Sequence, residues 1–212
     1  MAQEGELYTP IKIVIVGSAA SGKTRLVQRL CQNTWDEDAV YKPTIAIDLQ
    51  SKIVYLGNGR DKVRFSFWDT SGQPRFEAVT KNYYQHTDAF LFVFDASNPQ
   101  ETLEDCLKRF YRKEWLQSAN PNPFLAIVAC KFDANPDVLR DNPDLMRQIE
   151  STGMPLFWTS SREGKTQDIL QTAGHHVMAL RRAKLREERV MDSLYLIPKP
   201  LEERPACTCV LL

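Results

Sequence analysis

Apolar residues alternate along the chain between short continuous runs and longer stretches with helical spacing. The short runs predict strands at residues 11–16, 45–55, 63–68, 89–94, 124–129 and 154–158. Helical spacing predicts helices over residues 23–32, 101–116 and 167–188. The runs at 89–94 and 124–129 are apolar at every position, as expected for strands that are covered on both faces. The alternation of strands and helices therefore predicts an α/β fold with a mostly parallel six-stranded sheet and helices on both faces.

One strand of this sheet is expected to run antiparallel. The sequence Gly57-Asn58-Gly59 separates the second and third runs, and its residues tolerate the positive φ of a hairpin turn. The length of 212 residues fits one domain plus a tail. We expect a flexible N-terminus at 1–8, a single domain at 9–189 and a flexible tail at 190–212, where prolines replace the periodic pattern.

Composition narrows the class of protein. The formal net charge is zero with 25% charged residues, which argues against binding to nucleic acid. The five cysteines are odd in number and lack metal-ligand spacing, so the chain fits a reducing cytosol without a disulfide framework or zinc site. The N-terminus lacks the features of a signal peptide, and no apolar run approaches the roughly 20 residues of a membrane span. Any membrane attachment is therefore expected to use another device.

Residues 17–24, GSAASGKT, fit the phosphate-loop pattern G-x-x-x-x-G-K-[ST] between a predicted strand and a predicted helix. Gly17 and Gly22 would let backbone N–H groups surround phosphate oxygens at the positive end of the helix dipole. Lys23 is expected to contact the β- and γ-phosphates, and the Thr24 hydroxyl to bind Mg²⁺. The expected phosphate-binding residues are Gly17, Ser18, Ala19, Ala20, Ser21, Gly22, Lys23 and Thr24. A strand–turn–helix connection with chance glycines is the alternative, and the loop alone does not choose between ATP and GTP.

A second segment, FWDTSGQ at 67–73, follows another predicted strand. Alone, Asp69 would be interpreted as a strand-end cap, but beside a phosphate loop it is expected to hold Mg²⁺ through a water molecule. Gly72 can offer its N–H to a γ-phosphate, so that the loop is ordered only in the triphosphate state. Gln73 is the type of residue that orients an attacking water.

The sequence WDTSGQPRF at 68–76 resembles the WDTAGQERF segment of the Rab branch of the Ras superfamily of small GTPases. The resemblance extends from about residue 8 to about residue 185 and includes the tail. Residues 42–45, KPTI, resemble the first switch of the family, which implies that Thr44 contacts Mg²⁺ and the γ-phosphate in the GTP state. Ala46 stands where family members usually have Gly. Trp35 is the nearest candidate for the aromatic residue against guanine, although its spacing to Thr44 is long and packing on its own helix is the alternative.

Two later segments resemble the guanine motifs of the family. CKFD at 130–133 resembles Asn-Lys-x-Asp, which implies that Asp133 accepts hydrogen bonds from guanine and that the Lys131 stem covers the base. TSSR at 159–162 resembles Thr-Ser-Ala-Lys, which implies that the Ser161 N–H donates to guanine O6. The expected guanine-binding residues are Cys130, Lys131, Asp133, Ser160, Ser161, Arg162 and Trp35.

Two departures from the family pattern affect these expectations. Cys130 replaces the Asn of the guanine motif, and a thiol is a weak donor and acceptor. Losing one or two hydrogen bonds costs about 1–3 kcal/mol, so nucleotide release is expected to be faster than in relatives. Ala19 and Ala20 lie in the loop near the expected γ-phosphate, where their methyl groups can crowd Gln73. Hydrolysis is therefore expected to be slow without an activating protein.

The chain ends in CTCVLL, in which Cys209 begins a C-a-a-X box with terminal Leu. Cys207 resembles the first of the paired cysteines of Rab proteins. A single lipid anchors weakly, and residues 190–212 offer no basic cluster, so lipid on both Cys207 and Cys209 is expected. A frayed end with incidental cysteines is the alternative.

The resemblance implies a monomeric switch that binds GTP or GDP with Mg²⁺ and hydrolyses GTP through Lys23, Thr44 and Gln73. It also implies an exchange factor, an activating protein, effectors and a prenyl-carrying chaperone as partners. The expected location is the cytoplasmic face of an internal or plasma membrane, with a cytosolic pool and a role in vesicle traffic. The alternatives are a weakly hydrolysing interaction scaffold, a Ras- or Rho-type signalling switch, or a P-loop kinase, for which we identify no acceptor site or lid.

Overall fold

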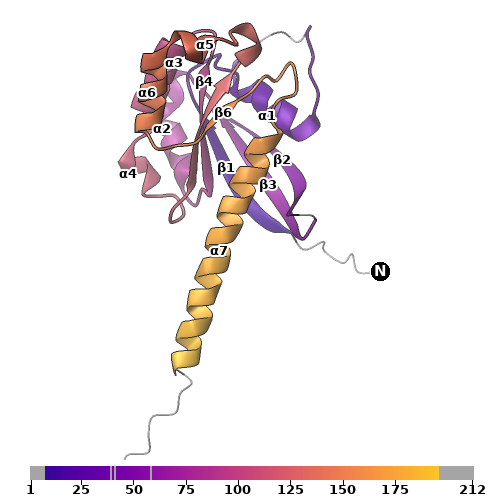
Figure 1. Ribbon diagram of the computed structural model, residues 1–212, viewed down its shortest axis with the longest axis vertical. Helices are drawn as coiled ribbons and strands as arrows, with labels where there is room; N and C mark the ends of the chain where they lie inside the picture. Colours follow the sequence, from indigo (N-terminus) through magenta and orange to yellow (C-terminus); the bar gives the residue numbers. More distant parts are fainter. Residues whose placement is uncertain (1–7, 39, 41, 58, 196–212) are drawn as a thin grey trace, which may run out of the picture. The chain divides into compact units, whose positions relative to one another are not determined.

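The computed structural model describes residues 8–38, 40, 42–57 and 59–195. Its centre is a six-stranded sheet with the strand order β2-β3-β1-β4-β5-β6 (Figure 1). Every neighbouring pair is parallel except β2 and β3, which form an antiparallel hairpin. The strands are β1 (Thr9–Val16), β2 (Ile47–Leu56), β3 (Asp61–Thr70), β4 (Ala89–Asp95), β5 (Phe124–Cys130) and β6 (Leu156–Trp158). The predicted mixed sheet is therefore confirmed.

The hairpin turn follows the predicted chemistry. Gly57 and Gly59 have φ values of 53° and 83°, in the left-handed region that glycine enters without a steric penalty. Asn58, the central residue of the predicted turn, lies outside the described residues. Each hairpin strand differs from its predicted bounds by one or two residues, because β-pairing continues until Ile47 meets Thr70 at one end and Leu56 meets Asp61 at the other.

Seven α-helices occur in the part of the chain that the structure describes. They are α1 (Lys23–Gln32), α2 (Glu77–Thr80), α3 (Pro99–Phe110), α4 (Lys113–Leu116), α5 (Val138–Asp141), α6 (Pro143–Ser151) and α7 (Gln167–Tyr195). Three short 3₁₀ segments are η1 (Pro74–Phe76), η2 (Lys81–Tyr84) and η3 (Phe132–Ala134). In Figure 1, α2, α3, α4 and α6 lie on one side of the sheet and α1 on the other, as expected for helices on both faces. The bounds of α1 agree with the prediction, whereas α2, α5 and α6 were not predicted.

The prediction of a single helix over residues 101–116 is wrong. The helix α3 ends at Phe110, and Arg112 has extended backbone angles before α4 begins. Aromatic packing accounts for the break, because Tyr111 contacts the Phe92 ring edge-on at 5.6 Å and Trp115 contacts the Tyr84 ring edge-on at 5.5 Å. These contacts outweigh the local helical preference of the segment.

The core has two layers because alternate strand residues point to opposite faces of the sheet. One layer packs β4 residues Phe90, Phe92 and Phe94 against α3 and α6, and it includes Tyr84, whose hydroxyl donates to the Phe110 carbonyl at 2.8 Å. In the other layer, Gly174 of α7 lies so close to β2 and β3 that a Cβ there would lie 2.5 Å from a Leu56 methyl. Both layers hold the carboxyl ends of the parallel strands in place beneath the candidate site.

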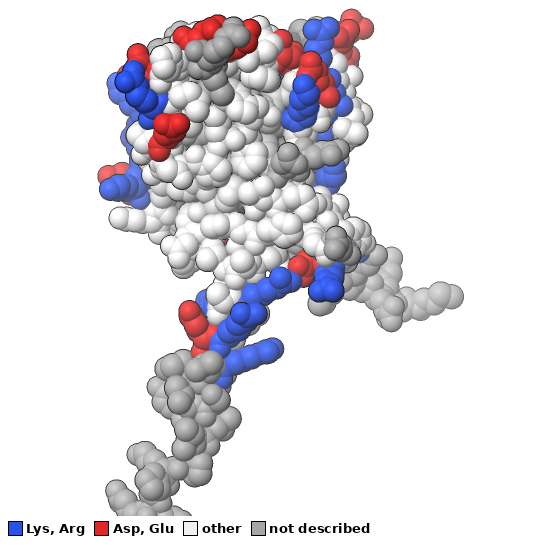
Figure 2. Space-filling model, in the orientation of Figure 1, with Lys and Arg blue, Asp and Glu red and all other residues white. Residues whose placement is uncertain are grey.

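The chain divides into two units between Val177 and Met178, inside α7. The helix continues to Tyr195, whereas the periodic pattern predicted its end at residue 188. In the second unit, Lys184 and Glu188 form an exposed pair at 3.9 Å, and Figure 2 shows Lys and Arg side chains along this part of the helix. Among the described helices, none has the length and apolarity to cross a bilayer. Cys207 and Cys209 lie outside the described residues.

Candidate nucleotide-binding site

The phosphate loop connects β1 to α1 at the point where the strand order of the sheet reverses, since β1 pairs with both β3 and β4. A Cβ on Gly17 would lie 2.1 Å from the Val93 carbonyl oxygen, so any larger residue would collide with β4. Gly22 has φ 104° and would bring a Cβ to 3.0 Å from the Cys130 Cβ. The two glycines are thus required by close backbone approach and by left-handed geometry.

Lys23 is buried under this loop. Its ammonium donates to the carbonyl oxygens of Gly17 at 2.9 Å and Ser18 at 2.7 Å. Burial lowers the pKa of Lys23 to about 8, and the opposing attraction of the Asp69 carboxylate limits the fall. A phosphate would give this buried cation a full negative partner in place of two carbonyl dipoles.

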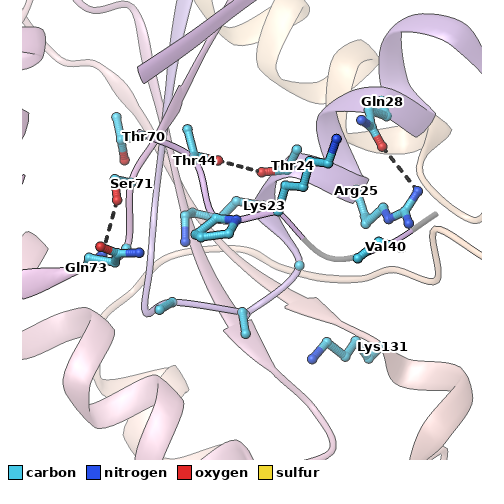
Figure 3. A pocket seen from close by; sticks show the side chains of 16 residues that line it. Lys23, Thr24, Arg25, Gln28, Val40, Thr44, Thr70, Ser71, Gln73 and Lys131 are labelled. Carbon is cyan, nitrogen blue, oxygen red and sulfur yellow. Dashed lines mark hydrogen bonds between the residues drawn. The ribbon is translucent and has the colours of Figure 1, made fainter. Parts of the chain in front are cut away.

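Three residues predicted to hold a metal ion come together from separate segments. The Thr24 hydroxyl donates to Asp69 Oδ2 at 2.6 Å and lies 3.0 Å from the Thr44 hydroxyl, as Figure 3 shows for the two threonines. The Asp69 side chain is fully buried, and this burial raises its pKa, whereas the hydrogen bond from Thr24 acts in the opposite direction. Among the described residues, Asp69 Oδ1 is one of two buried side-chain oxygens without a hydrogen-bond partner. Hydroxyl and carboxylate oxygens such as these are of the type that Mg²⁺ prefers.

The segment after β3 packs directly on the phosphate loop. A Cβ on Gly72 would lie 2.4 Å from the Ala19 backbone nitrogen, so only glycine permits this contact. Gln73 lines the same cleft, and its carboxamide oxygen accepts a hydrogen bond from Arg75 Nε at 2.8 Å. On the other side, the Ser71 N–H donates to the Ala46 carbonyl at 2.9 Å, which joins the first and second switch-like segments.

These segments enclose a cleft of about 500 Å³ (Figure 3). Predicted residues that line it are Ala19, Ala20, Gly22, Lys23, Thr24, Thr44, Gly72, Gln73 and Lys131. Gly17, Ser18 and Ser21 belong to the loop but do not line the cleft. Of these three, Ser18 turns its hydroxyl to Asp105 at 2.6 Å, and Ser21 is buried next to Lys23.

A second cavity of about 460 Å³ adjoins the first. The residues predicted to bind guanine that line it are Trp35, Cys130, Lys131, Asp133, Ser161 and Arg162. Ser160 is buried and lies behind the cavity, where its hydroxyl accepts from the Glu163 N–H at 3.0 Å. Lys131 has left-handed backbone angles and pairs with Asp95 at 2.5 Å. Six of the seven residues predicted to bind guanine therefore line one cavity.

Cys130 is buried at the end of β5 and lines the second cavity. Its sulfur accepts a hydrogen bond from the Thr159 hydroxyl at 3.3 Å, and its Cβ lies close to Gly22. Burial raises the pKa of Cys130 to about 11, and the hydrogen bond from Thr159 limits the rise. The residue is thus a neutral thiol near neutral pH, a poorer hydrogen-bonding group than the amide of the family motif.

The sequence did not identify three residues that shape the base cavity. Arg25 lies 5.2 Å from the Trp35 ring centre, so Trp35 both contacts its own helix and lines the cavity. Glu37 lines the cavity and pairs with Arg162 at 3.0 Å, and Arg29 anchors the loop of Arg162 by donating to the carbonyl of Ser161 at 2.5 Å. Each pair joins residues that are distant in sequence or separated by a turn, so only the fold brings them together.

In this mostly parallel sheet, the first strand leads through a glycine-rich loop to a helix, and a buried lysine and a threonine–aspartate cluster lie beside the loop. This combination defines a P-loop nucleotide-binding protein. Comparisons with known proteins refine this class. Residues 12–133 match the family model described as Ras of Complex, Roc, domain of DAPkinase.

Several relatives are similar over most of the chain. The chain is 36% identical over 166 residues to Ras-related protein Rab-7L1 of Rattus norvegicus, which covers 74% of this chain and 76% of that protein. It is 29% identical over 194 residues to Ras-related protein Rab-12 of Homo sapiens, covering 90% of this chain and 76% of that protein. A shorter match, 36% identical over 90 residues to GTP-binding protein ypt4 of Schizosaccharomyces pombe, covers 42% of this chain and 38% of that protein. The chain belongs to the Rab-like branch of the Ras superfamily of small GTPases, a family of GTP hydrolases.

Proposed function

We propose that this chain is a molecular switch that binds GTP and GDP with Mg²⁺ and hydrolyses GTP. The observation that carries the proposal is the convergence of Thr24, Thr44 and Asp69 beside the buried Lys23. These residues come from the start of α1, the segment before β2 and the end of β3. Thr44 and the residues that follow Asp69 both line the cleft, so a ligand bound there would contact both switch-like segments.

One nucleotide can account for both cavities. Gly22, Arg25 and Lys131 line both of them, so the cavities meet at these residues. A nucleotide with its phosphates over Lys23 would have its base beside Asp133. The Asp133 carboxylate accepts hydrogen bonds from the N1–H and 2-amino groups of guanine, whereas adenine offers no such pair of donors.

Bound Mg²⁺ would neutralise charge on the β- and γ-phosphate oxygens, and the Thr24 and Thr44 hydroxyls with the Asp69 carboxylate would hold it. The partnerless Asp69 Oδ1 fits this role, because it can accept from a metal-bound water. Lys23 offsets phosphate charge, the Gly72 N–H contacts the γ-phosphate, and Gln73 orients the attacking water. Loss of the γ-phosphate removes the contacts that hold the segments around Thr44 and Gly72 together. The surface that these segments present then changes.

A weakly hydrolysing scaffold is the second candidate. Two observations favour it: Ala19 lines the cleft with Gln73, and the Gln73 carboxamide oxygen is already bonded to Arg75. Single-turnover phosphate release separates the two functions, since a switch converts bound GTP to GDP and a scaffold retains GTP.

We further propose that lipid on Cys207 and Cys209 attaches the protein to the cytoplasmic face of a membrane, where effectors direct vesicle traffic. An exchange factor, an activating protein and a prenyl-carrying chaperone would serve the cycle, as the Rab relatives imply. Replacing both cysteines with Ser should move the protein from the membrane fraction to the cytosol. Retention on membranes by the double variant would contradict lipid anchoring.

The nucleotide preference is tested by mass spectrometry of the nucleotide that co-purifies with untreated protein, followed by titration with GDP and ADP. Guanine nucleotides are the expected ligands. The matched variant Asp133→Asn replaces a carboxylate acceptor by an amide. It should lower the affinity for GDP by roughly tenfold or more while it leaves the fold intact. Equal affinity of the wild-type protein for GDP and ADP would refute the proposal.

A further inference from the structure

The side chain of Arg109 on α3 holds the segment that begins at Gly72. Both terminal nitrogens of its guanidinium donate to the Gly72 carbonyl oxygen at 3.2 Å. Its Nε donates to Glu77 of α2 at 3.0 Å, and one terminal nitrogen also donates to Asp105 at 2.9 Å. One arginine thus bridges three acceptors, which belong to the segment after β3, to α2 and to α3 itself.

The same network reaches the phosphate loop. Asp105 accepts a hydrogen bond from the Ser18 hydroxyl at 2.6 Å, so Arg109 and Ser18 share one carboxylate. Gly72 itself packs on the Ala19 backbone, as described above. Helix α3 therefore links the loop under the phosphates to the residue expected to sense the γ-phosphate.

Burial makes these contacts strong relative to surface pairs. The Arg109 side chain is 13% exposed and its Glu77 partner 22% exposed, so solvent screens them less than an open ion pair. A planar guanidinium can satisfy a carbonyl and two carboxylates at once, which a lysine ammonium does with less directional control. Arg112 also pairs with Glu77, at 2.7 Å, and is 41% exposed.

We propose that Arg109 is a positioning residue for GTP hydrolysis, which holds the Gly72–Gln73 peptide against the phosphate loop before the γ-phosphate arrives. The inference rests on the proposed function, because it concerns the triphosphate that this cleft would bind. Holding the Gly72 carbonyl fixes the peptide that leads into Gln73, so less conformational entropy is lost when the γ-phosphate binds. Arg109 acts chiefly on the triphosphate state, because the Gly72 segment that it holds is expected to contact the γ-phosphate, which GDP lacks.

The test compares Arg109→Gln with the matched control Arg112→Gln. Both substitutions remove a cation from Glu77, but only the first removes the donors to the Gly72 carbonyl. Single-turnover GTP hydrolysis, affinity for a non-hydrolysable GTP analogue, the GDP dissociation rate and the thermal unfolding midpoint are measured for each protein. Arg109→Gln should lower the rate of GTP hydrolysis and the affinity for the analogue by roughly tenfold. The GDP dissociation rate should change by less than about twofold. Arg112→Gln should match the wild type in all nucleotide measurements.

The conservative variant Arg109→Lys retains the charge beside Glu77 and Asp105 and should fall between the wild type and Arg109→Gln. Two results would overturn the inference. The first is an unchanged rate of GTP hydrolysis in Arg109→Gln, and the second is an equal loss of affinity for GDP and for the GTP analogue together with a lower unfolding midpoint. The second result would assign Arg109 a purely structural role. Failure of the wild-type protein to prefer guanine nucleotides would instead refute the proposed function, so the two failures are distinguishable.

Discussion

Replacing Cys130 with Asn would place a carboxamide in the wall of the second cavity beside Gly22, where the chain now has a thiol. The present sulfur has one described hydrogen bond, from the Thr159 hydroxyl at 3.3 Å, and lies against Gly22 of the phosphate loop. An Asn side chain of similar volume offers one acceptor and two donor hydrogens in that position. Its oxygen can replace the sulfur as the acceptor for Thr159, which leaves its N–H groups for the loop or the base.

The expected gain follows from this count. One or two additional hydrogen bonds in a buried site are worth about 1–3 kcal/mol. If the amide acts on the bound state, the nucleotide dissociation rate should fall by roughly tenfold to a hundredfold. The same bonds also tie the base cavity to the phosphate loop, so GDP and GTP should be affected equally.

Stopped-flow release of a fluorescent GDP analogue measures this rate directly. Cys130→Ser and Cys130→Ala are the controls, since each removes the thiol without supplying an amide, and neither should slow release. The unfolding midpoint of each variant separates an altered site from an altered fold. Equal release rates for Cys130→Asn and the wild type would refute the idea that the thiol weakens nucleotide retention.

Three further predictions concern separate regions. Ala46 has φ 57°, a left-handed conformation that disfavours alanine, so Ala46→Gly should raise stability by about 1 kcal/mol and the unfolding midpoint by about 2–4 °C in thermal denaturation. Arg25→Gln should weaken GDP and GMP by roughly tenfold but leave guanosine unchanged in calorimetric titrations, because Arg25 lies where the two cavities meet; an equal loss for guanosine would contradict a phosphate contact. Burial raises the pKa of Cys106 to about 12, so the unfolded thiol ionises first as the pH rises above 9 and the native state loses stability from there to about pH 12. Between pH 8 and pH 10.5, the free energy of unfolding in urea should therefore fall by about 2 kcal/mol more for the wild type than for Cys106→Ala. An equal fall in both proteins would contradict the prediction.

The sequence predicted the parts of the fold that depend on local patterns. The continuous apolar runs became β4 and β5, and the helical spacing after the phosphate loop became α1 with the predicted bounds. Glycines that need positive φ or close approach marked the loop and the hairpin. Each of these signals lies within about ten neighbouring residues, so no distant contact was needed to interpret it.

The errors arose where distant contacts override the local pattern. Residues 101–116 have a helical composition throughout, yet the chain breaks after Phe110 because Tyr111 and Trp115 each pack on an aromatic ring of the core. Helix α6 is an exception, because its signal is local: Pro143 stands at its first turn, and Leu145 and Ile149 are buried at helical spacing.

The candidate site shows the same division between motif and environment. Asp133 and Lys23 could be assigned from motifs because their roles depend on fixed spacing within one segment. The partners of Arg109 lie in three other places along the chain, 37, 32 and four residues away. The sequence of α3 alone does not distinguish Arg109 from an exposed basic residue. Only the packing of α3 against the Gly72 segment brings the Gly72 carbonyl within hydrogen-bond distance of its guanidinium. If the triphosphate preference of this switch depends on that contact, it depends on a residue outside every recognisable motif, and motif matching alone would misjudge how firmly this protein distinguishes GTP from GDP.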